Sequence, residues 1–513
     1  MNLARYCLTS AAPDPGKTAL EVVGPGGDLL EVWKFADLTR QVLAVAAGLR
    51  ASGLDQGDRI LLRIGHSSDF PLLFFGAIAA GCVPIPTSSQ LTAAETGLVL
   101  ADSGARLVLH DGKTILPGDT AIRVLGPDGI RDLKSATPAG FAETAADDPA
   151  FLIYTSGTSG RPKGVLHAHR AAAARRPMDR GWYGMRRDDR LLHAGAFNWT
   201  YTLGAGLMDP WANGATSVVY DGPREPDLWP DLLTMSRATL FAAVPSLYRR
   251  ILKYGEVTRG SFPDLRHGLT AGEALSVPLY QDWKTRSGRE LYEALGMSEI
   301  STYLSSSPDV PVRPGSPGRP QAGRKVAILK EAGLKETGLE EIGLRETGEA
   351  VSFAKVEETG LLAVHRDEPG LMLGYWNSPQ ETEAAFRGDW FLTGDRARAD
   401  ADGYYWYEGR ADDLMNAFGY RVAPEEVERV LAADSQVQEV AVTAVPARDG
   451  VSLITAFVVP QDPASFDESR LAQHAARLLA EYKRPKVYRI LDSLPRTPSG
   501  KVKRTVLRQE DPS

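Results

Sequence analysis

The chain has 513 residues, more than one hydrophobic core holds, so we expect two or more domains. Hydrophobic residues make up 43% and charged residues 24%, as in ordinary globular proteins. Lys and Arg number 58 against 65 Asp and Glu, and this net charge of −7 argues against a nucleic-acid or anionic-membrane surface.

The cysteines and the longest apolar stretch predict the compartment. Cys7 and Cys82 lie far apart with no metal-like spacing, which excludes a disulfide framework and a structural zinc site. The N-terminus "MNLARYCLTSAAPDPGK" lacks the apolar run of a signal peptide. The uncharged stretch 71–86 is too short for a bilayer span, which takes about 20 apolar residues. We therefore expect a cytoplasmic protein with no membrane span.

Helical and strand patterns alternate along the first part of the chain. Residues 35–54 have helical spacing, 58–64 resemble a buried strand, 70–81 a helix and 82–86 a strand. The alternation recurs as a strand at 214–222, a helix at 230–238 and a strand at 239–245. This order predicts an α/β fold, with a large N-terminal domain of layered α/β subdomains.

A change of pattern follows near residues 407–433. The charged, turn-prone "GRADD" precedes a predicted hairpin, and a helix is expected after Pro424, with the acidic first turn that the helix dipole favours. The rest suits a small mobile α+β domain. We predict domains at residues 1–411 and 412–513, with the linker at 410–413.

One segment, 330–350, repeats a roughly five-residue unit that contains Glu, Gly and Leu. That period matches neither a helix face nor a strand face, and recurrent glycine disfavours a helix. An expanded surface loop or irregular hairpin is the simpler interpretation, and a partner-binding role stays open.

The stretch "YTSGTSGRPKG", residues 154–164, follows an apolar strand-like run. A Gly-rich turn lets backbone N–H groups converge on an anion, and Lys163 adds a positive charge. The P-loop pattern is not satisfied, because Pro162 stands before Lys163 where glycine should be. These residues alone leave a phosphate-binding loop and a mobile linker both open.

In sequence order, this stretch is followed by further motifs that together resemble the acyl-adenylate-forming superfamily of AMP-dependent acyl-CoA synthetases. The motifs are "TAGEAL" (270–275), "YEALGMSE" (292–299), "GLMLGYWNSPQET" (370–382), "DWFLTGD" (389–395), "GRADD" (409–413), "GYRVAPEEVE" (419–428) and "PRTPSGKVKR" (495–504). The resemblance covers essentially the whole chain except the Gly-Leu repeat. It implies a ligase that uses ATP, Mg²⁺ and coenzyme A to convert a small carboxylic acid into an acyl-CoA thioester.

The resemblance also implies nucleotide contacts. The loop should hold the β- and γ-phosphates through Thr155, Ser156, Gly157, Thr158, Ser159, Gly160 and Lys163. The adenine should lie against Gly272, Glu273 and Ala274. The segment Glu293, Ala294, Leu295, Gly296, Met297 and Ser298 should pass beneath the nucleotide, although relatives often carry an aromatic residue where this chain has Leu295.

Five charged residues receive individual roles from the resemblance. Glu299 is the expected Mg²⁺ ligand and shares the catalytic assignment with Lys501, which should bridge the substrate carboxylate and the α-phosphate. Asp395 should accept both ribose hydroxyls, with Arg410 on the same sugar. Asp412 falls at the hinge. The context of Lys501 also resembles a site of regulatory lysine acylation, which implies acylating and deacylating enzymes as partners.

Other positions are expected to bind the acyl acceptor, coenzyme A, and to determine which carboxylic acid fits. Gly419 should line the pantetheine channel, with Arg421 near phosphate, and the pocket wall should include Phe197, Asn198, Trp199, Tyr201 and Gly296. Because acetyl-CoA synthetases carry a Trp where this chain has Gly296, we expect a short- or medium-chain aliphatic acid or a benzoate-like aryl acid. The main alternative is transfer of the acyl group to a carrier-protein thiol. The sequence does not set the oligomeric state.

One histidine pair has two interpretations. His167 and His169 are two residues apart, a spacing that places them on opposite sides of a strand. A shared metal is therefore disfavoured, and packing around the loop is the expected role.

Overall fold

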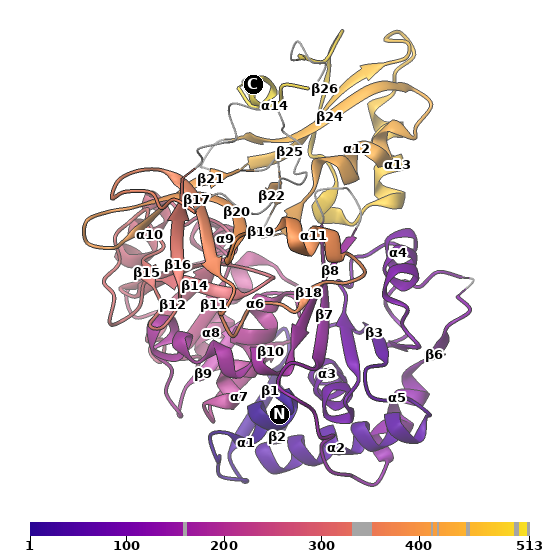
Figure 1. The fold of residues 1–513 in the computed structure, drawn as a ribbon. Coiled ribbons are helices and arrows are strands. Elements are labelled where there is room, and N and C mark those ends of the chain that lie inside the picture. The colour runs from indigo at the N-terminus through magenta and orange to yellow at the C-terminus, as the bar shows by residue number, and fades with distance from the viewer. Residues whose placement is uncertain are drawn as a thin grey trace.

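The computed structural model describes residues 1–118, 120–156, 162–330, 351–411, 414–417, 420–447, 452–496 and 502–509. Figure 1 shows two parts, with the residues after about 414 forming a small unit above a much larger one. The large part combines parallel sheets with covering helices, so the α/β class is confirmed. The Gly-Leu repeat (residues 331–350) lies outside the described residues, as does the predicted hinge Asp412, so the boundary at 411/412 stays a prediction.

The largest sheet has nine strands with a parallel centre and antiparallel edges. In spatial order they are β15 (Arg319–Pro320), β14 (Ser301–Ser305), β13 (Glu290–Met297), β12 (His267–Ala271), β11 (Leu240–Ala243), β9 (Arg190–His193), β10 (Thr216–Tyr220), β1 (Thr18–Val23) and β2 (Leu29–Lys34). The helices that precede or connect these strands are α1 (Leu3–Thr9), α6 (Thr200–Leu203), α7 (Asp209–Ala212), α8 (Trp229–Met235), α9 (Pro245–Tyr254) and α10 (Val277–Ser287). Shorter helical segments are η1 (His169–Ala171), η2 (Ala173–Arg175), η3 (Asp179–Tyr183), η4 (Gly204–Met208) and η5 (Pro226–Leu228).

A second, fully parallel sheet has the order β4 (Val83–Pro86), β3 (Arg59–Arg63), β5 (Leu107–His110), β6 (Arg123–Leu125). Its helices are α2 (Phe35–Ala51), α3 (Asp69–Ala80), α4 (Ala93–Ser103) and α5 (Pro127–Ser135). Almost every residue of α3 is buried, as expected for a helix without a polar face. The helix ends at Gly81, whose φ of 87° suits glycine. The alternation predicted for residues 35–86 is confirmed.

Two further sheets of the large part are antiparallel. A three-stranded sheet contains β7 (Pro149–Ser156), β8 (Pro162–Ala168) and β18 (Gly374–Tyr375). A five-stranded sheet contains β16 (Val326–Leu329), β17 (Gly360–His365), β19 (Phe386–Arg387), β20 (Trp390–Ala399) and β21 (Tyr405–Arg410), with α11 (Pro379–Ala384) preceding β19.

The C-terminal part is built on a sheet of β24 (Val437–Pro446), β25 (Ser452–Pro460) and β26 (Val487–Ile490). Its other elements are the hairpin β22 (Met415–Ala417) and β23 (Tyr420–Val422), then α12 (Pro424–Ala432), α13 (Glu468–Leu478), η7 (Glu481–Lys483) and α14 (Arg504–Leu507). The hairpin and the helix after Pro424 are as predicted.

The two faces of this C-terminal sheet carry different segments. One hydrophobic cluster joins the sheet to the hairpin, α12 and α13, through residues such as Met415, Val427 and Leu471. A separate cluster joins the sheet to Leu494, Val502 and Leu507. The hairpin and the segment that follows residue 501 therefore pack on opposite faces. No helix among the described residues is long and apolar enough to cross a membrane.

Candidate active site

The strands β7 and β8 fix both ends of the predicted phosphate loop. They pair antiparallel, with Thr155 opposite Lys163 and Ser156 opposite Pro162. Thr155, Ser156 and Lys163 are therefore neighbours at one end of the hairpin. Gly157, Thr158, Ser159 and Gly160 lie outside the described residues, so their contacts with phosphate stay a prediction.

Tyr375 connects Lys163 to Glu299. The Lys163 Nζ lies 4.1 Å from the centre of the Tyr375 ring and 2.6 Å from the Glu381 Oε2. The Tyr375 hydroxyl donates a hydrogen bond of 2.9 Å to the Glu299 Oε1. Two residues assigned to the triphosphate and its metal are thus brought together from distant parts of the chain. An incoming phosphate would compete with the Glu381 carboxylate for Lys163.

Glu299 has the free coordination capacity that a metal ligand needs. Its side chain is buried, with 7% exposed, and its Oε2 has no hydrogen-bond partner among the described residues. An orphaned buried carboxylate oxygen is unfavourable, and a hard cation would satisfy it. In the described part of the chain, no group of three or more His, Cys, Asp or Glu side chains is arranged to hold a metal ion. A single carboxylate fits Mg²⁺, which takes most of its remaining ligands from water and phosphate.

The predicted adenine segment lies where two parallel strands end. Ala271 of β12 is in register with Ala294 of β13, so residues 272–274 leave the sheet beside residues 295–297, where β13 continues in pairing with β14. Open α/β sheets bind ligands at this carboxyl edge. The Glu273 carboxylate accepts hydrogen bonds of 3.1 Å from both the backbone N–H and the hydroxyl of Ser246.

Glu293, in the predicted nucleotide segment, is buried and accepts a hydrogen bond of 2.9 Å from the Leu275 N–H. Burial raises the pKa of this carboxyl to about 8, and the Leu275 N–H only partly opposes that shift. Glu293 is therefore mostly protonated at neutral pH. At that pH the buried side chain carries no negative charge for most of the time.

This shift predicts a pH dependence of stability. Between about pH 4.5 and 8 the unfolded chain ionises Glu293 while the folded chain keeps it protonated, so the free energy of unfolding falls as the pH rises, by at most about 1.4 kcal/mol per unit. Glu293→Gln should flatten that fall in urea unfolding followed by circular dichroism. An unchanged slope against pH would contradict the assignment.

Gly296 has a local reason to be glycine. A Cβ at this position would overlap the carbonyl oxygen of Ser301 and the Cα of Thr302, on the strand that turns back beside it. The missing side chain is thus required by the β13–β14 turn. Gly296 by itself does not indicate the length of the acid.

His167 and His169 pack, as expected. His167 stacks on Phe151, with ring centres 4.5 Å apart, and hydrogen-bonds the Ser298 backbone. Burial lowers its pKa to about 3, so the ring is neutral. His169 accepts a hydrogen bond of 3.1 Å from the Leu3 N–H. His167 thereby supports the residue beside Glu299, a role that the sequence did not suggest.

The predicted ribose residues lie on paired strands. Asp395 on β20 is buried and is in register with residue 410 on β21. Its backbone N–H donates a hydrogen bond of 3.2 Å to the Thr393 hydroxyl. The side chains of Arg410 and Arg421 and all of Gly419, Asp412 and Lys501 lie outside the described residues, so their roles stay predictions.

The three aromatic residues of the predicted pocket wall pack against different neighbours. Phe197 is 5% exposed and stacks between His66 and Phe70, with ring centres 4.6 Å away in each case. Trp199 meets Tyr420 of the C-terminal hairpin edge-on at 4.3 Å. Tyr201 lies against Trp182 and His193. Phe197 therefore belongs to the aromatic core, whereas Asn198 lines a hollow beside Thr155 and Pro162.

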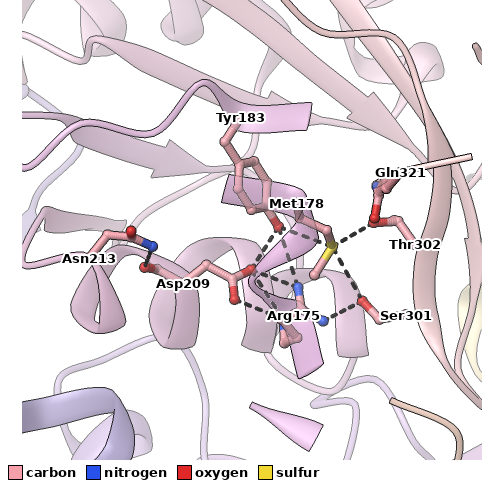
Figure 2. A network of polar contacts seen from close by, with 8 residues as sticks. All are labelled: Arg175, Met178, Tyr183, Asp209, Asn213, Ser301, Thr302 and Gln321. Atoms are coloured by element: carbon pink, nitrogen blue, oxygen red, sulfur yellow. Dashed lines mark hydrogen bonds and ion pairs between the residues drawn. The ribbon is translucent and has the colours of Figure 1, made fainter. Parts of the chain in front are cut away.

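A buried network supports the turn that follows Glu299 (Figure 2). Arg175 pairs with Asp209 at 2.8 Å, and the Tyr183 hydroxyl donates to the same carboxylate at 2.7 Å. Arg175 also donates to the Ser301 hydroxyl, and Ser301 has a φ of 81°, which a serine rarely adopts. The network therefore holds a strained turn two residues beyond the expected metal ligand.

Removing Asp209 should be costly. Asp209→Ala leaves the Arg175 guanidinium buried and unpaired, and we expect the free energy of unfolding to fall by about 3–5 kcal/mol in urea titration. Asp37→Ala, which breaks an exposed ion pair with Arg40, is the matched control and should change little. Equal losses in the two variants would contradict the role given to the network.

Comparisons with known proteins agree with this geometry. The family model for AMP-binding enzymes matches residues 8–376, and the model for their C-terminal domain matches residues 426–501. A 3-hydroxybenzoate–CoA ligase of Aromatoleum sp. (strain CIB) is 30% identical, over 93% of this chain and 91% of its own length.

Solved structures are similar over nearly the whole chain. A benzoate CoA ligase from Burkholderia xenovorans LB400 is 27% identical, with a TM-score of 0.71 over 99% of this chain and 100% of its own. A malonyl-CoA ligase with methylmalonyl-CoA and AMP bound is also 27% identical, with a TM-score of 0.77 over 96% of this chain and 99% of its own.

Proposed function

The chain belongs to the AMP-binding enzymes, and on that premise we propose that it is an ATP-dependent carboxylic acid:CoA ligase. The observation that carries the proposal is the linkage of Lys163 to Glu299 through Tyr375, beside the carboxyl edge of β12 and β13. This linkage supports the assignment of Lys163 to the triphosphate and of Glu299, whose Oε2 has no hydrogen-bond partner among the described residues, to its metal.

In the first step, an oxygen of the substrate carboxylate bonds to the α-phosphorus of ATP and the bond to pyrophosphate breaks. Thr155, Ser156 and Lys163 bind the departing phosphates, and Glu299 would hold Mg²⁺ through its Oε2. Bound Mg²⁺ neutralises phosphate charge. Lys501 stabilises the charge that develops at the α-phosphate, and Asp395 holds the ribose.

In the second step, the CoA thiolate attacks the acyl carbon, and the bond to the AMP oxygen breaks. Two contacts of the hairpin β22–β23 support a role for it in this step: the Asn416 Nδ2 donates a hydrogen bond of 2.7 Å to the Gly272 carbonyl oxygen, and Tyr420 contacts Trp199. Val502 packs on the opposite face of the C-terminal sheet. We propose that the domain rotates about Asp412 to present Lys501 first and Gly419 second.

For the acid, we propose a benzoate-like substrate, with a short- or medium-chain aliphatic acid as the second candidate. Tyr201 packs on the buried Trp182 and on His193, whose pKa burial lowers to about 3, so the surroundings of this predicted pocket residue are aromatic and uncharged. Two of the three similar ligases reported above are named for benzoate or 3-hydroxybenzoate and the third for malonyl-CoA, and all three names include CoA. That support favours CoA over a carrier-protein thiol.

The test is a pyrophosphate-release screen across acids of graded length and aromaticity, with and without CoA. We expect benzoate or a hydroxybenzoate to give the fastest release, with AMP and an acyl-CoA as products. Turnover that needs a carrier protein and ignores CoA would favour the alternative acceptor. No release with any acid would contradict the proposal.

Two further proposals concern the cellular location of the protein and the acylation of Lys501. We propose a cytoplasmic location, supported by the free, buried thiols of Cys7 and Cys82, which suit a reducing compartment. Regulatory acylation of Lys501 is a separate hypothesis, and it predicts an inactive acylated enzyme that a deacylase restores. Unchanged activity after stoichiometric acylation of Lys501 would contradict it.

A further inference from the structure

A buried triad of charges joins the two parts of the molecule. The Lys483 Nζ lies 2.9 Å from the Glu95 Oε1 and 2.6 Å from the Glu426 Oε1. Glu95 belongs to α4 of the large part, whereas Glu426 lies in the first turn of α12 in the small part. Lys483 is only 5% exposed and both glutamates are buried, so one lysine bridges two carboxylates that are largely shielded from water.

Contacts within the large part orient the Glu95 carboxylate independently of Lys483. Its Oε2 accepts hydrogen bonds of 3.0 Å from the backbone N–H and the hydroxyl of Thr92, the capping box that starts α4. The Thr92 hydroxyl also lies 3.3 Å from the Leu478 carbonyl oxygen, at the end of α13. The start of α4 therefore forms a preorganised docking point for the small part.

The triad lies beside an aromatic stack that reaches the active site. Tyr482, the neighbour of Lys483, stacks on Tyr420 with ring centres 3.8 Å apart, and Tyr420 contacts Trp199 edge-on. Lys483, Glu426 and Tyr482 also line the hollow that contains Asn198 and Thr155. The contact with α4 and the placement of the hairpin are therefore joined by one continuous set of contacts.

The contact between the two parts depends on the positive charge of Lys483. Burial alone would lower the pKa of Lys483, but Tyr482 and the two carboxylates raise it above its ordinary value, so the ammonium persists. Without that ammonium, two like charges would face each other away from water. A buried pair that loses one partner is strongly destabilised.

We propose that Lys483 is a positioning residue for thioester formation. By bridging Glu95 and Glu426, it docks the hairpin 415–422 against Trp199, in the orientation that the second half-reaction needs. Adenylation needs the opposite face of the C-terminal sheet, so the bridge must open once in every turnover. This inference rests on the proposed function.

The first test separates the half-reactions in Lys483→Met. Thioester formation from supplied acyl-adenylate should fall about tenfold or more, because the hairpin loses its docking point. Acid-dependent pyrophosphate exchange should stay unchanged or rise. Lys483→Arg should retain most of the thioester activity, and Lys486→Met, at an exposed lysine on the same segment, should behave as wild type. Equal loss of both half-reactions, or no loss of either, would overturn the proposal.

The second test measures the orientation directly, without catalysis. Dyes on Asp132→Cys and Gln473→Cys, both exposed, report the distance between the two parts by energy transfer, while native Cys7 and Cys82 are buried. Lys483→Met should broaden the distance distribution. The triple variant that adds Glu95→Gln and Glu426→Gln removes all three charges and should narrow it again. An unchanged distribution in Lys483→Met would overturn the proposal.

The two tests also separate this inference from the proposed function. If wild-type protein releases no pyrophosphate with any acid, the proposed function fails, and the distance measurement still reports whether Lys483 holds the two parts together. If wild type performs both half-reactions and Lys483→Met matches it in both, only the positioning role fails.

Discussion

Replacing Lys501 with alanine is expected to abolish acid-dependent pyrophosphate exchange and to spare thioester formation from supplied acyl-adenylate. When the carboxylate attacks the α-phosphate, negative charge gathers on the phosphate oxygens, and a cation in a water-poor site stabilises it strongly. Removing one such group costs about 10²–10³ in rate. Isotope exchange between labelled pyrophosphate and ATP measures this step alone.

The control for Lys501→Ala is Lys503→Ala, at an exposed lysine two residues away. It should keep both half-reactions. Thioester formation should survive in Lys501→Ala because Val502 packs on the face of the C-terminal sheet that is opposite the hairpin. If Lys501→Ala loses both half-reactions to the same extent, rotation of the small domain is the wrong account.

Replacing Gly419 with leucine is expected to have the opposite effect. The flanking strands β22 and β23 reach the active site, where Asn416 binds the Gly272 carbonyl and Tyr420 touches Trp199. A bulky side chain between them should obstruct the pantetheine arm, and misplacing the thiol by about 1 Å can cost about 10²-fold in rate. Pyrophosphate exchange should persist.

A graded series checks that the effect of Gly419→Leu is steric. Gly419→Ala should slow thioester formation less than Gly419→Leu, and both variants should keep wild-type pyrophosphate exchange. Raising the CoA concentration should not restore the rate if the thiol cannot reach the acyl carbon. Loss of pyrophosphate exchange in Gly419→Leu would show that the hairpin serves both steps.

Much of the fold could be predicted because its signals are local. The helix and strand patterns of residues 35–86 depend on periodicity within single elements, and the structure confirms α2, β3, α3 and β4. The hairpin before Pro424 was predicted from turn residues and a helix start. Sequence motifs likewise placed Lys163 and Glu299 near one nucleotide, and Tyr375 joins them.

The supporting contacts could not be predicted, because each joins residues far apart in the sequence. Tyr375 and Glu299 are 76 positions apart, and Lys483 and Glu95 are 388 apart. Arg175 and Asp209 both resemble ordinary surface charges until the chain buries them together. The packing of Phe197 on His66 and Phe70 was likewise not predictable, and its assignment to the pocket wall stays a prediction.

The central claim is that the acid is joined to AMP before it is joined to CoA. Turnover of a carboxylic acid labelled in both oxygens with heavy oxygen, followed by mass spectrometry of the released AMP, tests this directly. Attack of the carboxylate on the α-phosphorus, then of the thiolate on the acyl carbon, leaves one carboxylate oxygen in the phosphate of AMP. We expect one heavy oxygen in each AMP formed. Unlabelled AMP, or release of ADP and phosphate in its place, would contradict the account.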